Sequence, residues 1–241
     1  MTADRRNESG GGVAGTYRSY ASSRRKRRAW DASNPGNRAI RQEVRDHLLA
    51  ASADQLRGDG RILDVGCGGG YWLRALAAAG VEESRLHGVD LIEDRVVSAA
   101  RSLPRADLRV ADASRLPHPD SYFDLILMFT VLSSLPDRQS VRSALIEAER
   151  VTARGGRIIV WEPRVRNPLN RSVRLASFRL LRPLVMDAME VASVRSLTVA
   201  PPLARRLGPM TASLYPRLAR LGFLRTHELI VLERIGDRDP P

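Results

Sequence analysis

The chain has 241 residues, of which 43% are hydrophobic and 27% are charged, so it can bury one substantial core with a small attached segment. No run approaches the roughly 20 apolar residues of a transmembrane helix, and the polar stretch 1–15 lacks the apolar centre of a secretory signal. The single cysteine, Cys67, excludes an internal disulfide, so we expect a cytoplasmic protein; the composition leaves its oligomeric state open.

The net charge of +12 is carried by the two ends of the chain. Residues 1–57 contain 12 basic and 6 acidic side chains, residues 58–162 contain 13 and 15, and residues 163–241 contain 14 and 6. The basic cluster 24–28 is compatible with contact to nucleic acid or to an anionic membrane surface, but a solvated basic arm is the preferred interpretation.

Short apolar runs alternate with helical patterns through the middle of the chain. After a basic arm, 1–29, with the composition of a disordered segment, Asn37 is expected to cap a helix that runs to about Leu56. The elements predicted next are strand 61–65, helix 70–79, strand 85–90, helix 93–102, strand 107–111, strand 123–129, helix 138–153 and strand 156–161. Strands that alternate with helices imply right-handed crossovers and a parallel sheet. The scattered histidines show no metal-ligand spacing, so no metal site is expected.

Residues 163–241 depart from this alternation. The predicted elements are helix 172–182, strand 194–199 ended by Pro201-Pro202, helix 203–221, and a last strand 223–235 interrupted by His227 and Glu228. The basic, polar stretch 163–182 favours either an anionic part of a substrate or a lipid surface as its partner.

The most informative stretch is Ile62-Leu63-Asp64-Val65-Gly66-Cys67-Gly68-Gly69-Gly70-Tyr71, an apolar strand that runs into a turn with almost no side chains. Glycines allow positive φ and a close approach of the backbone to a ligand, and open α/β sheets bind ligands beyond the carboxyl ends of their strands. Asp64 lies inside the strand, where a buried carboxylate is costly unless a ligand cation or the amides of the turn pair with it. A nicotinamide-binding turn, G-x-G-x-x-G, would need a glycine where Tyr71 stands.

The run D-V-G-C-G-G-G, residues 64–70, resembles the first motif of class I S-adenosylmethionine-dependent methyltransferases, whose glycine turn holds the methionine end of the cofactor. Asp90 matches the second motif, whose acidic residue binds the cofactor ribose. The stretch 110–117 resembles the segment whose aspartate, here Asp112, contacts the adenine amino group. Runs 119–126 and 148–157 match in the same order, so the chain is similar to the small-molecule branch called type 11 methyltransferases.

The resemblance implies S-adenosyl-L-methionine as cofactor and a Rossmann-like α/β fold: a seven-stranded, mostly parallel sheet with helices on both faces and an N-terminal helical cap. It divides the chain into the arm 1–29, a cap helix 30–57, a cofactor-binding core 58–162 and a substrate-side segment 163–241. The cofactor-binding residues that it implies are Asp64, Gly66, Cys67, Gly68, Gly70, Asp90, Leu91, Asp112, Ala113 and Phe129.

The resemblance does not identify the general base. Many relatives carry a histidine after the fourth strand, but here residues 130–137 contain no imidazole. Glu162, directly after strand 156–161, is the candidate catalytic residue, because a carboxylate there can accept a proton from an acceptor hydroxyl or orient an amine. A structural loop tether is the alternative role for Glu162.

The acceptor is expected to be a small metabolite attacked at oxygen, nitrogen or carbon. Its pocket is expected to be formed by the loops 129–137 and 162–171 together with the segment near Trp30. RNA methylation by the basic flanks is an alternative, disfavoured because the sequence contains no additional RNA-binding domain. A non-catalytic cofactor-binding module is the third interpretation.

Overall fold

The structure is a computed structural model that describes residues 31, 33–166, 174–184 and 188–235. The predictions for the basic arm 1–29, for Trp30 and for the second half of the loop 162–171 lie outside these residues. Among the described helices, none is both long enough and apolar enough to cross a membrane.

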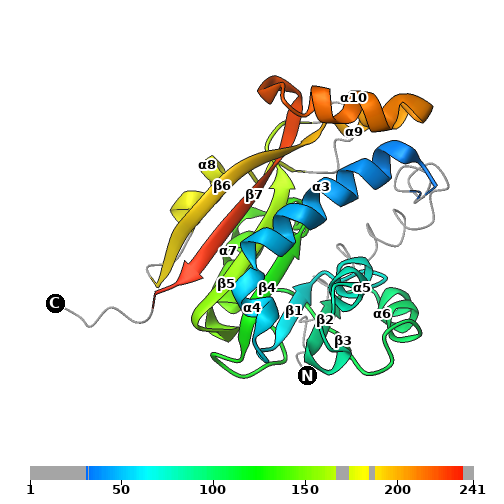
Figure 1. The fold of residues 1–241 in the computed structure, drawn as a ribbon. Coiled ribbons are helices and arrows are strands. Elements are labelled where there is room, and N and C mark those ends of the chain that lie inside the picture. The colour runs from blue at the N-terminus through cyan, green and yellow to red at the C-terminus, as the bar shows by residue number, and fades with distance from the viewer. Residues whose placement is uncertain (1–30, 32, 167–173, 185–187, 236–241) are drawn as a thin grey trace, which may run out of the picture.

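The predicted seven-stranded, mostly parallel sheet is confirmed, and its strands lie in the order β3-β2-β1-β4-β5-β7-β6 (Figure 1). The strands are β1 (Ile62–Val65), β2 (Leu86–Asp90), β3 (Asp107–Val110), β4 (Phe123–Phe129), β5 (Thr152–Pro163), β6 (Met189–Val199) and β7 (Arg225–Arg234). The first five pair in parallel, and β7 is antiparallel to both β5 and β6. The carboxyl ends of β1 to β6 therefore lie at one edge of the sheet, called the carboxyl edge below.

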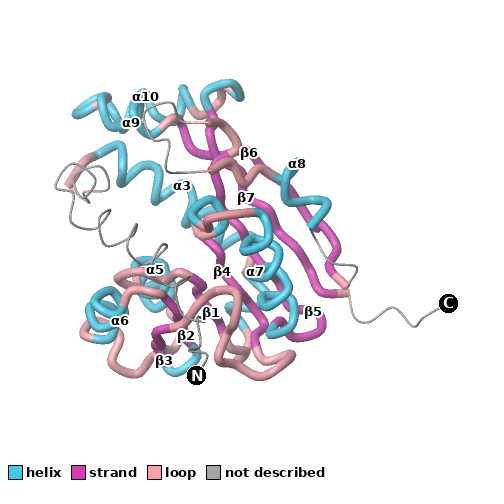
Figure 2. Tube along the Cα trace, turned by 180° about the vertical axis from the view of Figure 1, so that it is seen from behind, coloured by secondary structure: helices cyan, strands magenta, loops and turns pink. Residues whose placement is uncertain are grey.

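Helices cover both faces of the sheet (Figure 2). The helices are α3 (Pro35–Ala51), α4 (Ala53–Arg57), α5 (Tyr71–Ala78), α6 (Glu93–Ala100), α7 (Arg138–Val151), α8 (Phe178–Leu181), α9 (Pro201–Arg206) and α10 (Thr211–Leu218). One hydrophobic cluster joins a face of the sheet to α3, α5, α9 and α10, and a second joins the opposite face to α7 and α8. Because both faces are covered, a central strand such as β4 is a nearly continuous apolar run.

The start of α3 differs from the prediction. The N-cap is Asn34, whose side chain accepts a hydrogen bond from Asn37 N, so the predicted cap at Asn37 is wrong by three residues. Pro35 fits the first helical position because its fixed φ suits a helix and its missing N–H would lack a partner there. The helix ends at Ala51, where the hydroxyl of Ser52 donates to Leu48 O, and α4 continues the path.

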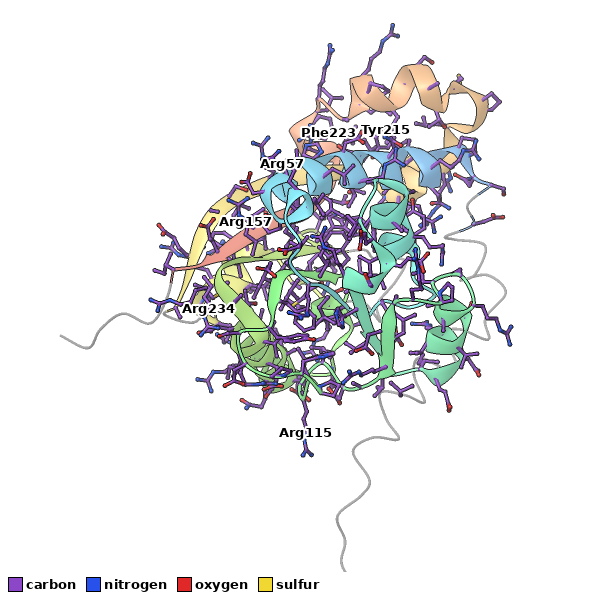
Figure 3. All side chains as sticks on the ribbon, turned by 60° about the horizontal axis from the view of Figure 1, so that its bottom comes forward. Arg57, Arg115, Arg157, Tyr215, Phe223 and Arg234 are labelled. Carbon is purple, nitrogen blue, oxygen red and sulfur yellow. The ribbon has the colours of Figure 1, made fainter. Side chains whose placement is uncertain are left out.

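The helices at the carboxyl edge pack on α3 through polar as well as apolar contacts. Tyr215 on α10 (Figure 3) donates to Glu43 Oε2 on α3 at 2.7 Å, and the amide of Thr198 donates to the same oxygen at 3.0 Å. A Cβ atom at Gly36 would lie 2.1 Å from Ala204 O, so the backbones of α3 and α9 are in direct contact. The N-terminal helix is therefore an integral part of this face.

The C-terminal elements also differ from the prediction. Strand β6 begins at Met189, five residues before the predicted start, and β7 is not interrupted, because His227 and Glu228 pair with Pro163 and Glu162 of β5. The prolines at 201 and 202 begin α9 as well as ending β6. Within the described residues, the helix predicted for 172–182 is limited to α8 and a 3₁₀ turn.

Candidate active site

The glycine turn connects β1 to α5 at the carboxyl edge. The amides of Gly66 and Cys67 donate to Val89 O at 2.7 and 2.9 Å, so the turn is anchored to β2. Gly66, Gly68 and Gly70 have φ values of 73°, 53° and 77°, which side chains other than glycine rarely adopt. A Cβ atom at Gly68 would meet nothing within 4 Å. The backbone there is open to a ligand.

Two carboxylates lie beneath this turn. Asp90 Oδ2 accepts from Gly68 N and Asp90 Oδ1 accepts from Ile92 N, both at 2.9 Å, and Arg95 Nη1 lies 3.8 Å from Asp90 Oδ2. Asp64 is 1% exposed, and its Oδ2 has no hydrogen-bond partner among the described residues. Burial raises the pKa of Asp64 well above its ordinary value, and the nearby Asp90 raises it further. The turn amides donate to Val89 O and Asp90 instead, so Asp64 Oδ2 is suited to a cationic partner.

Cys67 is a buried turn residue. Its side chain is 6% exposed, and burial together with Asp64 and Asp90 raises the pKa of its thiol. A thiol that is buried and protonated is a poor nucleophile.

The segment after β3 reaches the same edge. Ala111 N donates to Asp90 O at 3.1 Å, which ties the ends of β2 and β3 together. Asp112 is exposed, and its Oδ1 accepts from the amide and the hydroxyl of Ser114 at 2.8 and 2.7 Å. Ala113 and Leu91 are both half-buried. The hydrogen bond from Ala111 thus places Asp112, the next residue, at the same edge of the sheet as Asp90.

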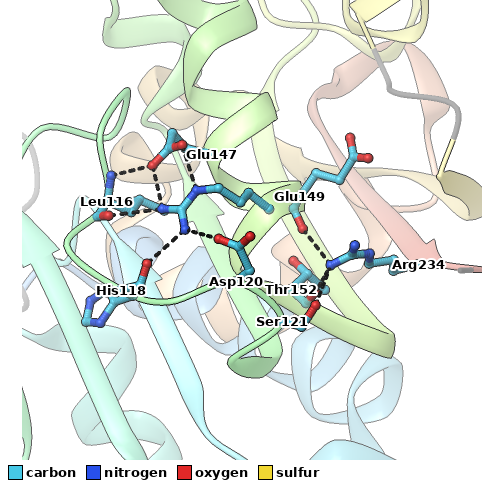
Figure 4. A network of polar contacts seen from close by, with 9 residues as sticks. Leu116, His118, Asp120, Ser121, Glu147, Glu149, Thr152 and Arg234 are labelled. Carbon is cyan, nitrogen blue, oxygen red and sulfur yellow. Dashed lines mark hydrogen bonds and ion pairs between the residues drawn. The ribbon is translucent and has the colours of Figure 1, made fainter. Parts of the chain in front are cut away.

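Arg150, in the last turn of α7, holds the loop that follows Asp112. Figure 4 labels its partners Leu116, His118, Asp120 and Glu147. Its guanidinium donates to Leu116 O and His118 O at 3.1 and 2.9 Å. It also pairs with Glu147 at 2.8 Å and Asp120 at 2.6 Å. The motif segments 110–117 and 148–157, which match the family separately in sequence, are therefore joined in space.

The loop after β4 is fixed between the glycine turn and the end of β5. A Cβ atom at Gly66 would lie 2.5 Å from Val131 Cγ2. Glu162 Oε1 accepts from Leu132 N at 2.6 Å, and Oε2 accepts from Ser133 N at 3.3 Å. Glu162 is fully buried, and burial raises its pKa to about 8. The candidate base therefore lies next to the loop 130–134 and already binds its backbone.

A row of rings lies in the core below this loop. Trp72 and Phe129 are 5.0 Å apart between ring centroids, Phe129 and Trp161 are 6.0 Å apart, and Trp161 stacks on His227 at 4.9 Å. Burial lowers the pKa of His227 to about 4, so this ring is neutral at neutral pH. Of these four rings, only Phe129 is among the site residues predicted from the sequence. The register between β4 and β5 identifies Trp161 as the direct neighbour of Phe129.

Comparisons with known proteins agree with this geometry. The profile of the methyltransferase domain family matches residues 63–160. Over 180 residues the chain is 31% identical to the ubiquinone/menaquinone biosynthesis C-methyltransferase UbiE of Burkholderia mallei (strain SAVP1), a match that covers 73% of this chain and 70% of that protein.

Two solved structures share the fold. The N-methyltransferase NodS of Bradyrhizobium japonicum, solved with S-adenosyl-l-homocysteine, is 15% identical, with a TM-score of 0.65 over 93% of this chain and 99% of that one. The cyclase SpnF is 21% identical, with a TM-score of 0.54 over 79% of each chain. At such low identity, these structures establish a common fold and say nothing about the reaction.

Glu162→Gln is expected to change the pH dependence of stability. The folded pKa of about 8 exceeds the ordinary value of 4.5, so the stabilising contribution of the protonated group is complete below the lower value and is lost as pH rises towards 8. Between about pH 5 and 8, the unfolding free energy of the wild type should therefore fall as Glu162 ionises. The unfolding free energy of the variant should fall less, and the difference should be at least about 1 kcal/mol. Urea denaturation across this pH range measures the difference.

Glu147→Gln is the matched control. Arg150 lowers the pKa of Glu147, so the contribution of this carboxylate is lost as pH falls rather than as it rises. Parallel stability curves for the wild type and Glu162→Gln would contradict the raised pKa of Glu162.

Proposed function

The chain belongs to the methyltransferase domain family of class I S-adenosylmethionine-dependent methyltransferases that act on small molecules, and on that premise we propose how its residues serve the transfer. The cofactor supplies a methyl group that its sulfonium already activates. The protein must then hold the cofactor, align the nucleophile of the acceptor and exclude water. A cytoplasmic location is part of the proposal, and cell fractionation tests it.

The unpaired Oδ2 of Asp64 is the observation that carries the cofactor assignment. A buried carboxylate oxygen without a partner is costly, and the cationic amino group of the cofactor's methionine end would remove that cost. The open backbone at Gly68 gives the same ligand room beside the turn. Two independent features, the unpaired Oδ2 of Asp64 and the open backbone at Gly68, therefore fit this cofactor.

The other predicted residues have roles that their positions support. Asp90 would hold the ribose, because each of its oxygens already accepts one hydrogen bond and can accept another. Asp112 and Ala113 would contact the adenine, with Leu91 beside them. The full proposed cofactor site consists of Asp64, Gly66, Cys67, Gly68, Gly70, Asp90, Leu91, Asp112, Ala113 and Phe129.

On the acceptor side, we propose that Glu162 holds the loop 130–134 in place and, when ionised, accepts a proton from the acceptor. Its two hydrogen bonds to the backbone support the first role, and a pKa of about 8 suits the second near neutral pH. Among the possible nucleophiles, carbon is supported first, since the 31% identical relative is named a C-methyltransferase.

Gly68→Ala should weaken cofactor binding at least about tenfold, or about 1.4 kcal/mol, because the added methyl group enters the space reserved for the ligand. Isothermal calorimetry with S-adenosylmethionine and S-adenosylhomocysteine measures this. Gly208→Ala is the matched control: Gly208 has φ 52° against 53° for Gly68, and a Cβ atom at either position meets nothing within 4 Å. Equal affinity losses would assign the effect to backbone strain, and tight NADH binding without any response to S-adenosylmethionine would refute the cofactor site.

The protein should transfer labelled methyl from S-adenosylmethionine into the small-molecule fraction of a cell extract. Product mass then identifies the acceptor and the attacked atom. Replacing the five basic residues 24–28 by glutamine should leave this transfer nearly intact and insensitive to salt. Label that appears in RNA instead, with a steep loss at higher salt, would support the RNA alternative.

With the acceptor so identified, Glu162→Gln should lower turnover at least about tenfold while leaving the affinity for S-adenosylmethionine unchanged. Glutamine keeps the size of the side chain and removes the charge. A loss that disappears at a pH where wild-type Glu162 is protonated would identify proton acceptance. Unchanged turnover would leave Glu162 with a structural role only.

A further inference from the structure

The connection between β6 and β7 carries large apolar side chains that face solvent. Met210 is 58% exposed, Leu221 is 42% exposed and Phe223 is 78% exposed. They lie at the two ends of α10, and Figure 3 labels Phe223 on the 3₁₀ turn that leads into β7. Single exposed apolar residues are ordinary, but three within one short connection call for an explanation.

The same connection carries positive charge that no acidic residue within it balances. Between Glu190 and Glu228 the sequence has no acidic residue and six arginines, of which four lie in the connection, one in β6 and one at the start of β7. Arg205 and Arg225 donate to Asn37 and to backbone carbonyls, so they serve the fold. Three others are exposed and form no ion pair within the described part of the chain: Arg206, Arg217 and Arg220. We call these three arginines, together with Met210, Leu221 and Phe223, the crossover rim.

The crossover rim lies on the side of the molecule where the proposed active site opens. Strand β6 is parallel to β5, because both are antiparallel to β7, so the connection from β6 to β7 leaves the sheet at the carboxyl edge. Figure 1 shows α9 and α10 beyond this end of the two strands. Val165 is 45% exposed and directly follows Arg164, whose amide donates to Thr226 O at 2.9 Å, so it adds apolar surface at the same end.

We propose that the crossover rim docks the protein on an anionic lipid bilayer. Apolar side chains flanked by arginines match the boundary of such a membrane, where hydrocarbon lies directly below negatively charged headgroups. The long arginine side chains can reach the headgroups while the apolar ones enter the acyl region. RNA would match the arginines and the ring of Phe223, but not Met210 and Leu221, which offer no ring for a base to stack on.

Docking in this orientation turns the carboxyl edge towards the membrane. An acceptor dissolved in the bilayer would then reach the active site without crossing bulk water. This consequence rests on the proposed methyl transfer, whereas the docking itself does not. The test below therefore measures binding alone, and its failure would leave the cofactor and acceptor proposals untouched.

The full-length protein should co-sediment with vesicles of equimolar phosphatidylglycerol and phosphatidylcholine, and much less with phosphatidylcholine alone. Arg217→Gln combined with Arg220→Gln should lower the partition coefficient at least about tenfold, and Phe223→Ser about fivefold. One matched control combines Arg101→Gln and Arg142→Gln, which removes the same charge from the C-cap of α6 and from α7. The other is Val97→Ser, which removes a 45% exposed apolar side chain from α6. Both controls should bind like the wild type.

A thiol probe reports the orientation independently. Cys67 is buried and its pKa is raised, so a polarity-sensitive dye should label Phe223→Cys selectively. Its emission should shift to the blue on anionic vesicles, whereas the same dye on Val97→Cys should not respond.

Three outcomes would overturn the proposal. Equal losses of vesicle binding in the rim variants and the control variants would mean that net charge alone attracts the protein to the vesicles. Rim variants that lose binding to total RNA while keeping vesicle binding would assign the surface to nucleic acid. A lipid-independent self-association that Phe223→Ser abolishes, measured by sedimentation velocity, would assign it to a second copy of the chain.

Discussion

The placement of two carboxylates, Asp64 and Asp90, beneath one glycine turn is the constraint on which the site depends. Asp90 is stabilised by two amide donors and by Arg95, whereas Asp64 Oδ2 has no partner among the described residues. Burial, and to a lesser extent the nearby Asp90, makes ionisation of Asp64 less favourable and raises its pKa. A cation bound at this point would be attracted by both, so the electrostatic cost in the free protein becomes affinity for a positively charged ligand.

The glycine turn also fixes the acceptor side, because the loop after β4 is packed between Gly66 and Glu162. At the start of this loop Thr130 has φ 57°, a conformation that a β-branched residue adopts only when its surroundings impose it. Thr130 N donates to Trp161 O at 2.9 Å, which holds that conformation in place. The glycine turn, the loop 130–134 and the row of rings are therefore packed as one unit, and a substitution in any of them is expected to shift the others.

The parts of the fold that the sequence predicted are those that local pattern determines. Strand β4 has the predicted ends, 123 and 129, because a buried parallel strand is a continuous apolar run. The N-cap was misplaced by one helical turn, since Asn34 and Asn37 are equally good caps until Pro35 is considered. Two other errors, the interruption predicted in the last strand and the unpredicted row of rings, arise from contacts between distant residues. His227 pairs with Pro163 and stacks on Trp161, which is 66 positions away in the chain. Such pairings are set by the sheet and leave no local pattern.

The two edges of the sheet differ in how their charges are used. At the edge where β4 and β5 begin, Arg150 binds two backbone carbonyls and two carboxylates, and Arg234 binds two backbone carbonyls and the hydroxyl of Ser121. These two arginines therefore hold loops to α7 and β7. At the carboxyl edge, an unpaired carboxylate oxygen and three arginines without ion pairs among the described residues remain. Fold-level similarity extends to a cyclase as well as to methyltransferases, so the fold itself does not select a reaction. That selection must come from side chains at the carboxyl edge, among them Glu162 and the rings of Phe129 and Trp161 near the glycine turn.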